Sequence, residues 1–207
     1  MNYKVLDHPL IKHKLTIMRK ADTTTKDFRE NLDEIAGLMA YEITRDVKTE
    51  KVQIETPIGK SEQERLAEDI ILVPILRAGL GMVDGIRSLI PNAKIGHIGV
   101  YRDEETYEAK EYFNKLPNSI SDGFVMVLDP MLATGVSACA ALDMVKEAGA
   151  KKIKLVCLVG VKEGIAAIAK EHPDVEIVLA ALDEGLNENN YIVPGLGDAG
   201  DRLFGTK

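Results

Sequence analysis

Hydrophobic and polar residues follow a helical period in the N-terminal part of the chain. Five apolar residues between positions 28 and 43 recur at steps of three or four, and charged residues lie between them. This spacing places the five side chains on one face of an α-helix, which can then pack against a core. Thr24 or Thr25 can cap that helix, and Pro9 marks the first turn of a shorter helix before it. The apolar stripe consists of Phe28, Leu32, Ile35, Met39 and Ile43.

From residue 70 onward, short continuous apolar runs alternate with helical periods. Such runs are typical of strands that helices cover on both faces. The expected strands cover residues 70–73, 95–100, 124–128, 153–159 and 175–181, and the expected helices cover 79–89, 137–148 and 164–171. This β-α-β order predicts an α/β fold with a doubly wound, mostly parallel sheet that binds ligands beyond the carboxyl ends of its strands. We expect residues 1–207, with the N-terminal helices, to form a single domain.

Three segments depart from this repeat. Val52 and Ile54 alternate with polar residues, which predicts a half-buried strand that ends in a turn over residues 56–59. The charged segment 101–115 is interpreted as a hairpin or flap. The tail 183–207 and this flap both carry apolar anchors, so we expect both to be ordered.

The composition narrows the range of partners. The chain has 26 Lys and Arg against 33 Asp and Glu among 207 residues, a formal net charge of -7, which disfavours general attraction to nucleic acid or anionic membrane. The longest apolar run, residues 70–76, is too short to span a bilayer and contains Pro74. No stretch near the N-terminus resembles a signal peptide. We therefore expect no nucleic acid, no membrane and only a local phosphate site.

The cysteines and histidines show no metal-binding or triad spacing. Cys139 and Cys157 lie in apolar periodic segments and form no C-x-x-C pair, which predicts buried thiols in a reducing compartment and a cytoplasmic protein. The histidines are His8, His13, His97 and His172.

The segment 129–137 carries the most distinctive chemistry. An apolar strand runs directly into Asp129, and Thr134 and Ser137 stand where the next helix opens. Small and hydroxyl residues at such a position let backbone N–H groups and hydroxyls converge on a phosphate beside the positive end of a helix dipole. The carboxylate would repel a phosphate but suits a neutral diol, so the loop fits a ribose that carries a phosphate. The alternative is purely structural, with a strand-end aspartate and a Thr or Ser that only caps the helix.

Four motifs in order resemble those of the uracil phosphoribosyltransferases. They are the loop 129–137, VPILRAGLGM at 73–82, YRDEET at 101–106, and the tail 185–201, which is similar to that family's uracil-binding end. The similarity extends from about residue 8 to residue 207. It implies a type I phosphoribosyltransferase-like fold with a flap at 101–115 and a base-binding hood at 183–207. The implied reaction transfers the phosphoribosyl group of 5-phosphoribosyl 1-pyrophosphate (PRPP) to N1 of uracil, giving UMP and pyrophosphate.

The resemblance also implies which residues bind PRPP. Arg77 and Arg102 contact the pyrophosphate, although each could instead be a solvated surface arginine. Asp198 faces the ribose, the pyrophosphate or the attacking nitrogen, unless it only stabilises a turn. We take Arg77, Asp129 and Asp198 as catalytic. The PRPP loop comprises Asp129, Pro130, Met131, Leu132, Ala133, Thr134, Gly135, Val136 and Ser137.

Uracil itself is read by backbone groups. By the resemblance these belong to Ile192, Gly197 and Ala199, with Asp198 beside them. The pyrimidine edge of uracil presents an acceptor, a donor and an acceptor, which backbone N–H and C=O groups can match. Cytosine reverses two of the three, which would leave buried groups unpaired at about 1 to 3 kcal/mol each.

Position 136 departs from the family pattern. The family usually has a second glycine after Gly135, where this chain has Val136. If this position needed a positive φ, a β-branched side chain would cost about 1 to 3 kcal/mol. We expect ordinary backbone angles there, with Val136 donating its N–H as glycine would.

The tail contains the letters G-x-G-x-x-G at residues 195–200, which alone would suggest a dinucleotide-binding fold. We reject that interpretation because Val193–Pro194 is a poor preceding strand and because no helix is expected in the few residues after Gly200.

The resemblance implies further ligands and partners. Mg²⁺ is expected, held mainly by PRPP oxygens rather than by protein ligands, and GTP, which activates some relatives, is the effector to test. A homodimer or larger homo-oligomer is implied, with the apolar N-terminal helices as candidate interface elements.

The alternative function is a regulator of the same fold that senses uridine nucleotides and binds RNA, although RNA binding should bring a basic face.

Overall fold

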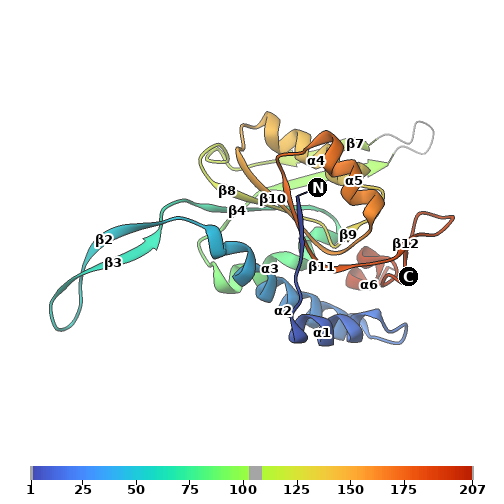
Figure 1. Cartoon of the computed structure of the whole chain (residues 1–207), viewed down its shortest axis with the longest axis horizontal. Coiled ribbons are helices and arrows are strands. Elements are labelled where there is room, and N and C mark those ends of the chain that lie inside the picture. The colour runs from blue at the N-terminus through green and yellow to red at the C-terminus, as the bar shows by residue number, and fades with distance from the viewer. Residues whose placement is uncertain (1, 103–108, 207) are drawn as a thin grey trace.

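A central sheet of nine strands organises the protein. The computed structural model describes residues 2–102 and 109–206 (Figure 1). The strands of the central sheet are β1 (Tyr3–Val5), β4 (Ile70–Leu76), β5 (Lys94–Ile95), β6 (His97–Arg102), β7 (Ala109–Lys115), β8 (Phe124–Leu128), β9 (Met131–Leu132), β10 (Lys152–Gly160) and β11 (Glu176–Leu182). The order is β1-β11-β10-β8-β4-β6-β7, with β5 beside β4 and β9 beside β10. Every pair is parallel except β6 with β7, which confirms the predicted mostly parallel sheet.

Helices cover both faces of this sheet. The helices are α1 (Pro9–Arg19), α2 (Thr25–Ile43), α3 (Val83–Leu89), α4 (Val136–Glu147), α5 (Lys162–Glu171) and α6 (Ala199–Phe204). Figure 1 shows α4 and α5 on one face and α1, α2 and α3 on the other. Alternate residues of β8 enter the two cores. Phe124, Met126 and Leu128 pack on the side of α2, and Val125 and Val127 on the side of α4.

The N-terminal helices begin where the sequence predicts. Thr24 is the N-cap of α2, and its hydroxyl accepts a hydrogen bond from the N–H of Asp27 at 3.1 Å. All five residues of the apolar stripe are buried. Pro9 lies in the first turn of α1, where its missing N–H costs no helical hydrogen bond.

The strands β4 and β8 meet at the centre of the sheet. They pair in parallel from Ile70 beside Phe124 to Pro74 beside Leu128. After β4 the chain passes to β6 on one side, and after β8 it passes through α4 to β10 on the other. The carboxyl ends of β4 and β8 therefore flank the point where the connections diverge, which is where sheets of this class bind ligands.

The predicted strand around Val52 is half-buried only at Val52 itself. It forms β2 (Thr49–Glu55), which pairs only with β3 (Lys60–Leu66) in a separate two-stranded hairpin that projects from the body (Figure 1). Ile54 is 41% exposed because the projecting hairpin has no core beneath it. The alternating pattern correctly predicted a strand, but half-burial holds for Val52 and is wrong for Ile54, and β3 was not predicted.

Smaller corrections concern the next segments. The predicted helix at 79–89 starts as a 3₁₀ helix, Ala78–Met82, before α3 begins. The predicted strand at 95–100 divides into β5 and β6.

Cys157 is buried but Cys139 is only half-buried, so the prediction of two buried thiols was wrong for Cys139, which lies near the start of α4.

The strands β6 and β7, which enter segment 101–115 from its two ends, pair antiparallel, as a hairpin requires. Residues 103–108 and the side chain of Arg102 lie outside the described part of the structure. Within the described ranges, no helix combines the length and apolar character needed to cross a membrane.

Candidate active site

Asp129 stands at the carboxyl end of β8, as predicted. Its backbone N–H donates to the carbonyl of Val156 in β10 at 3.1 Å, which continues the sheet by one residue. The carboxylate Oδ1 accepts a hydrogen bond from the N–H of Met131 at 3.3 Å. Burial disfavours the charged form and raises the pKa of Asp129 to about 7, despite that hydrogen bond. Within the described residues, the N–H of Met131 is the only hydrogen-bond donor to this carboxylate. Most of its lone pairs can therefore accept hydrogen bonds from a ligand.

The loop after Asp129 leads into α4 without a side-chain cap. Gly135 is the N-cap, with a left-handed φ of 84°, and no side chain bonds to the first turn. A Cβ at Gly135 would lie 3.0 Å from the Cβ of Ala167, so glycine suits the position in both angle and space. The hydroxyls of Thr134 and Ser137 have no hydrogen-bond partner among the described residues. The structural alternative, in which one of them caps the helix, is therefore wrong.

Val136 is the first residue of α4, and the only non-glycine residue with positive φ in the described ranges is Asn190. The expectation of ordinary backbone angles at position 136 is confirmed. A β-branched residue costs no left-handed strain there.

The loop after β4 packs directly against the end of β8. A Cβ at Gly79 would lie 2.4 Å from the carbonyl oxygen of Leu128, so only glycine permits this approach. Arg77, which precedes this contact, has a side chain that is 55% exposed. Its Nη2 lies 3.6 Å from Oδ1 of Asp201, and its guanidinium lies 5.7 Å from the ring centroid of Phe204. Arg77 thus links the central sheet to the C-terminal segment.

The C-terminal segment folds over these two loops as a compact turn and helix. The strands β12 (Gly185–Leu186) and β13 (Ile192–Val193) pair antiparallel. The Val193–Pro194 peptide bond is cis, and Gly195 and Gly197 have positive φ. The helix α6 then begins at Ala199, so the expectation that no helix could form here was wrong. The dinucleotide interpretation still fails, because β13 pairs only with β12 and no strand follows α6 in the described residues.

Asp198 is the N-cap of α6. Its Oδ1 accepts a hydrogen bond from the N–H of Asp201 at 2.8 Å, which is the turn-stabilising role considered as its alternative. Asp198 also lines the cavity described next, so the cap does not remove it from the site.

A cavity of about 210 Å³ lies between the sheet loops and the C-terminal segment. Among the predicted residues, it is lined by Asp129, Met131, Ala133, Ile192, Gly197, Asp198 and Ala199. The structure thus brings together parts of two segments that the sequence assigned to PRPP and to uracil, 129–133 and 192–199. The lining does not include Arg77, Pro130, Leu132, Thr134, Gly135, Val136 or Ser137, although Ala78 next to Arg77 belongs to it.

The cavity also has lining residues that were not predicted as site residues. These are Ala78, Asn190, Tyr191 and Gly200. Tyr191 and Gly200 lie inside the motif that resembles the uracil-binding end, so the motif could have included them. Asn190 has φ 61°, a left-handed angle that asparagine tolerates better than most residues, but the sequence gives no firm signal of it.

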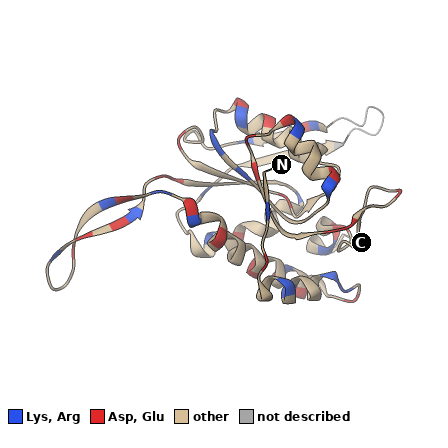
Figure 2. Ribbon diagram, in the orientation of Figure 1, with Lys and Arg blue, Asp and Glu red and all other residues tan. Residues whose placement is uncertain are grey.

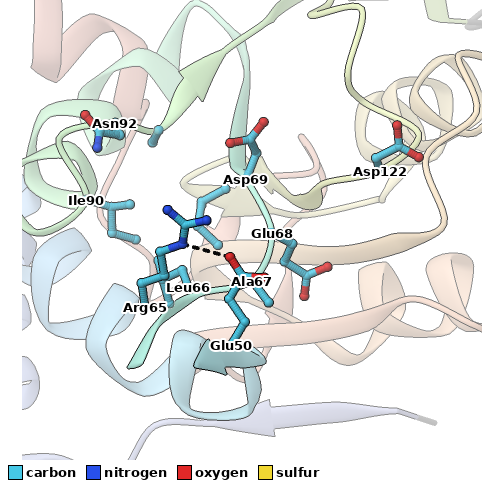
Figure 3. Close-up of a pocket in the computed structure, with 11 residues that line it drawn as sticks. Glu50, Arg65, Leu66, Ala67, Glu68, Asp69, Ile90, Asn92 and Asp122 are labelled. Atoms are coloured by element: carbon cyan, nitrogen blue, oxygen red, sulfur yellow. Dashed lines mark hydrogen bonds and ion pairs between the residues drawn. The ribbon is translucent and has the colours of Figure 1, made fainter. Parts of the chain in front are cut away.

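A larger cavity, of about 650 Å³, lies at the opposite ends of the same strands (Figure 3). It is lined by residues at the foot of the β2–β3 hairpin and at the amino ends of β4 and β8. Figure 3 shows Arg65 beside Glu50, and these two form an ion pair of 2.7 Å. Asp69 pairs with Lys94 at 2.5 Å, and Glu68 pairs with Lys152. Three of its acids are thus already neutralised by lysine or arginine.

The family model for uracil phosphoribosyltransferase matches residues 5–206. The chain belongs to the uracil phosphoribosyltransferase family. It is 60% identical to the uracil phosphoribosyltransferase of Mycoplasma capricolum over 207 residues, which cover 100% of both chains. This agrees with the resemblance that the four motifs carry.

Solved structures support the same fold. The AQ2163 protein of Aquifex aeolicus superposes with a TM-score of 0.93 at 40% identity, covering 98% of this chain and 97% of that one. The adenine phosphoribosyl transferase of Trypanosoma brucei has a TM-score of 0.62 at 14% identity, over 95% of this chain and 88% of that one. The fold is thus that of phosphoribosyltransferases, as the resemblance implied.

Proposed function

We propose that the chain transfers the phosphoribosyl group of PRPP to N1 of uracil, giving UMP and pyrophosphate. The observation that carries this proposal is the convergence of two loops on one cavity. Asp129 and its loop approach from the sheet, and Gly197 to Ala199 approach from the C-terminal segment. Membership of the uracil phosphoribosyltransferase family over nearly the whole chain supports it.

In this proposal the sheet loops bind PRPP. Asp129 accepts hydrogen bonds from the ribose hydroxyls, and the unpartnered hydroxyls of Thr134 and Ser137 bind the 5-phosphate with the backbone of residues 130–137. Arg77 and Arg102 bind the pyrophosphate. Charge-assisted hydrogen bonds from a guanidinium suit a phosphate that gains charge as it leaves.

The C-terminal segment reads the base. Backbone groups of Ile192, Gly197 and Ala199 match the three polar groups along the edge of uracil. A cavity of about 210 Å³ leaves room for a small base, and its wall from 197 to 200 consists of glycine and alanine apart from Asp198. The missing side chains let the backbone approach the base closely.

The reaction then requires one bond exchange at C1 of the ribose. Uracil N1 forms a bond to C1 while the bond from C1 to the pyrophosphate oxygen breaks and pyrophosphate takes the electron pair. The N1 proton passes to the leaving pyrophosphate. We expect an oxocarbenium-like transition state and inversion at C1. The protein contributes by orienting the two reactants and by stabilising the charge on the leaving group. Asp198 faces the ribose or the N1 proton.

Mg²⁺ would neutralise charge on the pyrophosphate oxygens. Asp129 and Asp198 supply oxygen donors of the type that Mg²⁺ prefers. Within the described residues, no group of three His, Cys, Asp or Glu could hold a metal by itself. The donor set therefore fits an ion that takes most of its ligands from PRPP and water. Chelation with EDTA should abolish activity, and added Mg²⁺ should restore it.

Product analysis tests the proposed reaction. The protein is incubated with Mg²⁺, PRPP and, separately, uracil, cytosine, hypoxanthine or orotate. We expect UMP from uracil and no nucleotide from the other three bases. A nucleotide from another base, with none from uracil, would contradict the proposal.

We also propose that the protein is a homodimer or larger homo-oligomer. The β2–β3 hairpin supports this, because it pairs with no other strand of the described residues and Ile58 at its turn is 97% exposed. An isolated two-stranded hairpin is marginally stable in water, so a second copy is the expected cover. The apolar stripe of α2 is buried in the chain's own core and is not available for an interface. Sedimentation of the protein with and without residues 52–63 tests the hairpin's role.

Three expectations remain, concerning GTP, RNA and the cellular compartment. GTP as an effector is tested by adding it to the assay above. Figure 2 shows acidic and basic residues interspersed along the helices and the hairpin rather than a basic face on the described part of the chain, which does not favour the RNA-binding alternative. A reducing, cytoplasmic setting fits the two free thiols, Cys139 and Cys157.

A further inference from the structure

Two arginine side chains hold the backbone immediately before the proposed uracil-reading residues. Arg19 is the last residue of α1, and Arg202 lies in α6. Between them they donate hydrogen bonds to the carbonyl oxygens of Gly195 and Leu196. The segment is therefore anchored by side chains from both ends of the sequence.

Arg19 and Asp183 form a bidentate ion pair beside Gly195. Nη1 of Arg19 lies 2.8 Å from Oδ2 of Asp183, and Nη2 lies 2.6 Å from Oδ1. The side chain of Asp183 is 4% exposed. The N–H of Gly195 donates to Asp183 at 2.9 Å, and its carbonyl accepts from Arg19 at 2.6 Å. Both backbone polar groups of Gly195 are thus fixed by one buried charge pair.

Arg202 fixes the following residue to the end of α1. Its Nη1 donates to the carbonyl oxygen of Leu196 at 2.8 Å and to that of Met18 at 2.6 Å, and its Nη2 donates to that of Lys20 at 2.6 Å. The guanidinium lies 4.6 Å from the ring centroid of Phe28 in α2. The last carbonyls of a helix lack helical partners, so Arg202 satisfies them and ties the segment to α1 at once.

We propose that Arg19, Asp183 and Arg202 are positioning residues that set the affinity and selectivity for uracil. None of the three belongs to the lining of the cavity, so they act through the backbone of Gly195 and Leu196. A base reader made of N–H and C=O groups discriminates only if those groups cannot turn, because a mobile backbone could present the opposite pattern to cytosine. This inference rests on the proposed function, since it assigns the reading of uracil to Gly197 and Ala199.

Steady-state kinetics with uracil and PRPP varied separately test the inference. Arg202→Met keeps most of the side-chain volume but removes three donated hydrogen bonds, and Asp183→Asn keeps the shape but removes the charge. We expect the KM for uracil to rise about tenfold in each variant and the preference over cytosine to fall, while kcat and the KM for PRPP change less than about twofold. Arg202→Lys should recover part of the loss. If Arg202→Met does not fold, Asp183→Asn carries the test.

Arg45→Met is the matched control. It removes an arginine that pairs with Glu42 at 2.7 Å near the end of α2, and it should leave every constant unchanged. An unchanged KM for uracil in the folded variants would overturn the inference. A fall in kcat together with equal rises in both KM values, not reversed by Arg202→Lys, would also overturn it. Such a result would indicate a merely structural role.

Amide hydrogen exchange separates this inference from the proposed function. If the unmodified protein makes no UMP from uracil, the proposed function fails, but anchoring can still be measured. Arg202→Met should then speed exchange over residues 192–200 relative to Arg45→Met. Equal rates in the two variants would overturn the anchoring itself.

Discussion

The two ends of β4 and β8 contrast in how their polar groups are satisfied. At the amino ends, the cavity of about 650 Å³ has acids that already pair with Arg65, Lys94 and Lys152. At the carboxyl ends, the cavity of about 210 Å³ is bordered by Asp129, whose pKa is raised to about 7 by burial. Segment 129–137 continues to the hydroxyls of Thr134 and Ser137, for which the described residues provide no hydrogen-bond partner. Asp129 therefore retains acceptor capacity for a ligand, whereas three acids of the larger cavity are already paired.

The two cavities thus differ in which acids are already paired and not only in volume. Asp129, Thr134 and Ser137 are half-buried, so water reaches them in the free protein and a ligand can replace that water. The contrast can be tested with matched changes at the two ends.

The largest effect is expected from Gly79→Ala at the carboxyl ends. The added Cβ would meet the carbonyl oxygen of Leu128 at 2.4 Å and Cα of Pro74 at 3.1 Å, so backbone must shift under both loops. We expect about 1 to 3 kcal/mol lower stability. Misplacement of the reacting groups should lower kcat/KM by about 100-fold or more. Urea unfolding and UMP formation measure the two effects.

Gly59→Ala in the hairpin is the control for that change, because nothing lies within 4 Å of its added Cβ. Equal activity losses in both variants would contradict the account.

Asp129→Asn should keep the fold but weaken binding of the ribose hydroxyls. Loss of a charged hydrogen bond, about 1.5 to 3 kcal/mol, should lower kcat/KM about tenfold to 150-fold. Asp122→Asn changes an exposed acid of the amino-end cavity in the same way and should have no effect. Measuring kcat/KM for both variants tests this difference. An unchanged kcat/KM in Asp129→Asn would refute the role of Asp129 in binding the ribose.

The raised pKa of Asp129 predicts opposite effects of pH on activity and stability. Because the folded pKa is about 7 against an ordinary 3.8, the unfolded chain releases this proton first, and stability falls as pH rises from about 4 to 7. Asp129→Asn should therefore be more stable than the unmodified protein at pH 8, by at most about 4 kcal/mol, and equally stable near pH 3. Denaturant unfolding at the two pH values measures this.

Activity should depend on the ionised form of the same group. The kcat/KM of the unmodified protein should fall as pH drops through about 7, and the profile of Asp129→Asn should lack that step. A step that persists in the variant would assign the titration to another group.

The smallest effect is expected from Glu68→Gln at the amino ends. The side chain of Glu68 is 9% exposed and pairs with Lys152, whose side chain is 51% exposed. Loss of this half-exposed pair should cost about 1 kcal/mol of stability, with kcat/KM unchanged within about twofold. A tenfold loss of activity would mean that the amino-end cavity takes part in function.

Much of the sheet and its loops could be predicted because their signals are local. The continuous apolar run of β8 ending at Asp129 and the helix that begins at Val136 are adjacent in sequence. Alternation likewise predicted β2, but it could not reveal whether a core lies beneath a strand. That depends on elements elsewhere in the chain, so the projecting hairpin was missed.

The C-terminal segment shows where local signals end. Its helix α6 is short, yet an Asp before it and a Gly after it are residue types that commonly cap helices and could have predicted it. In the structure Asp198 is the N-cap and Gly205, with φ 66°, is the C-cap. The anchor formed by Arg19 and Asp183 joins residues 164 positions apart, and no period or motif links them. Contacts of this kind appear only once the fold brings α1 beside the segment.

Amide hydrogen exchange with and without UMP distinguishes ligand binding at the carboxyl ends of β4 and β8 from binding at their amino ends. We expect UMP to slow exchange in residues 129–137, which follow the carboxyl end of β8. We expect it also to slow exchange in residues 192–200, which belong to the C-terminal segment above that end. No change is expected in residues 65–70 and 90–93, which line the amino-end cavity. Protection confined to the amino-end residues would contradict the account.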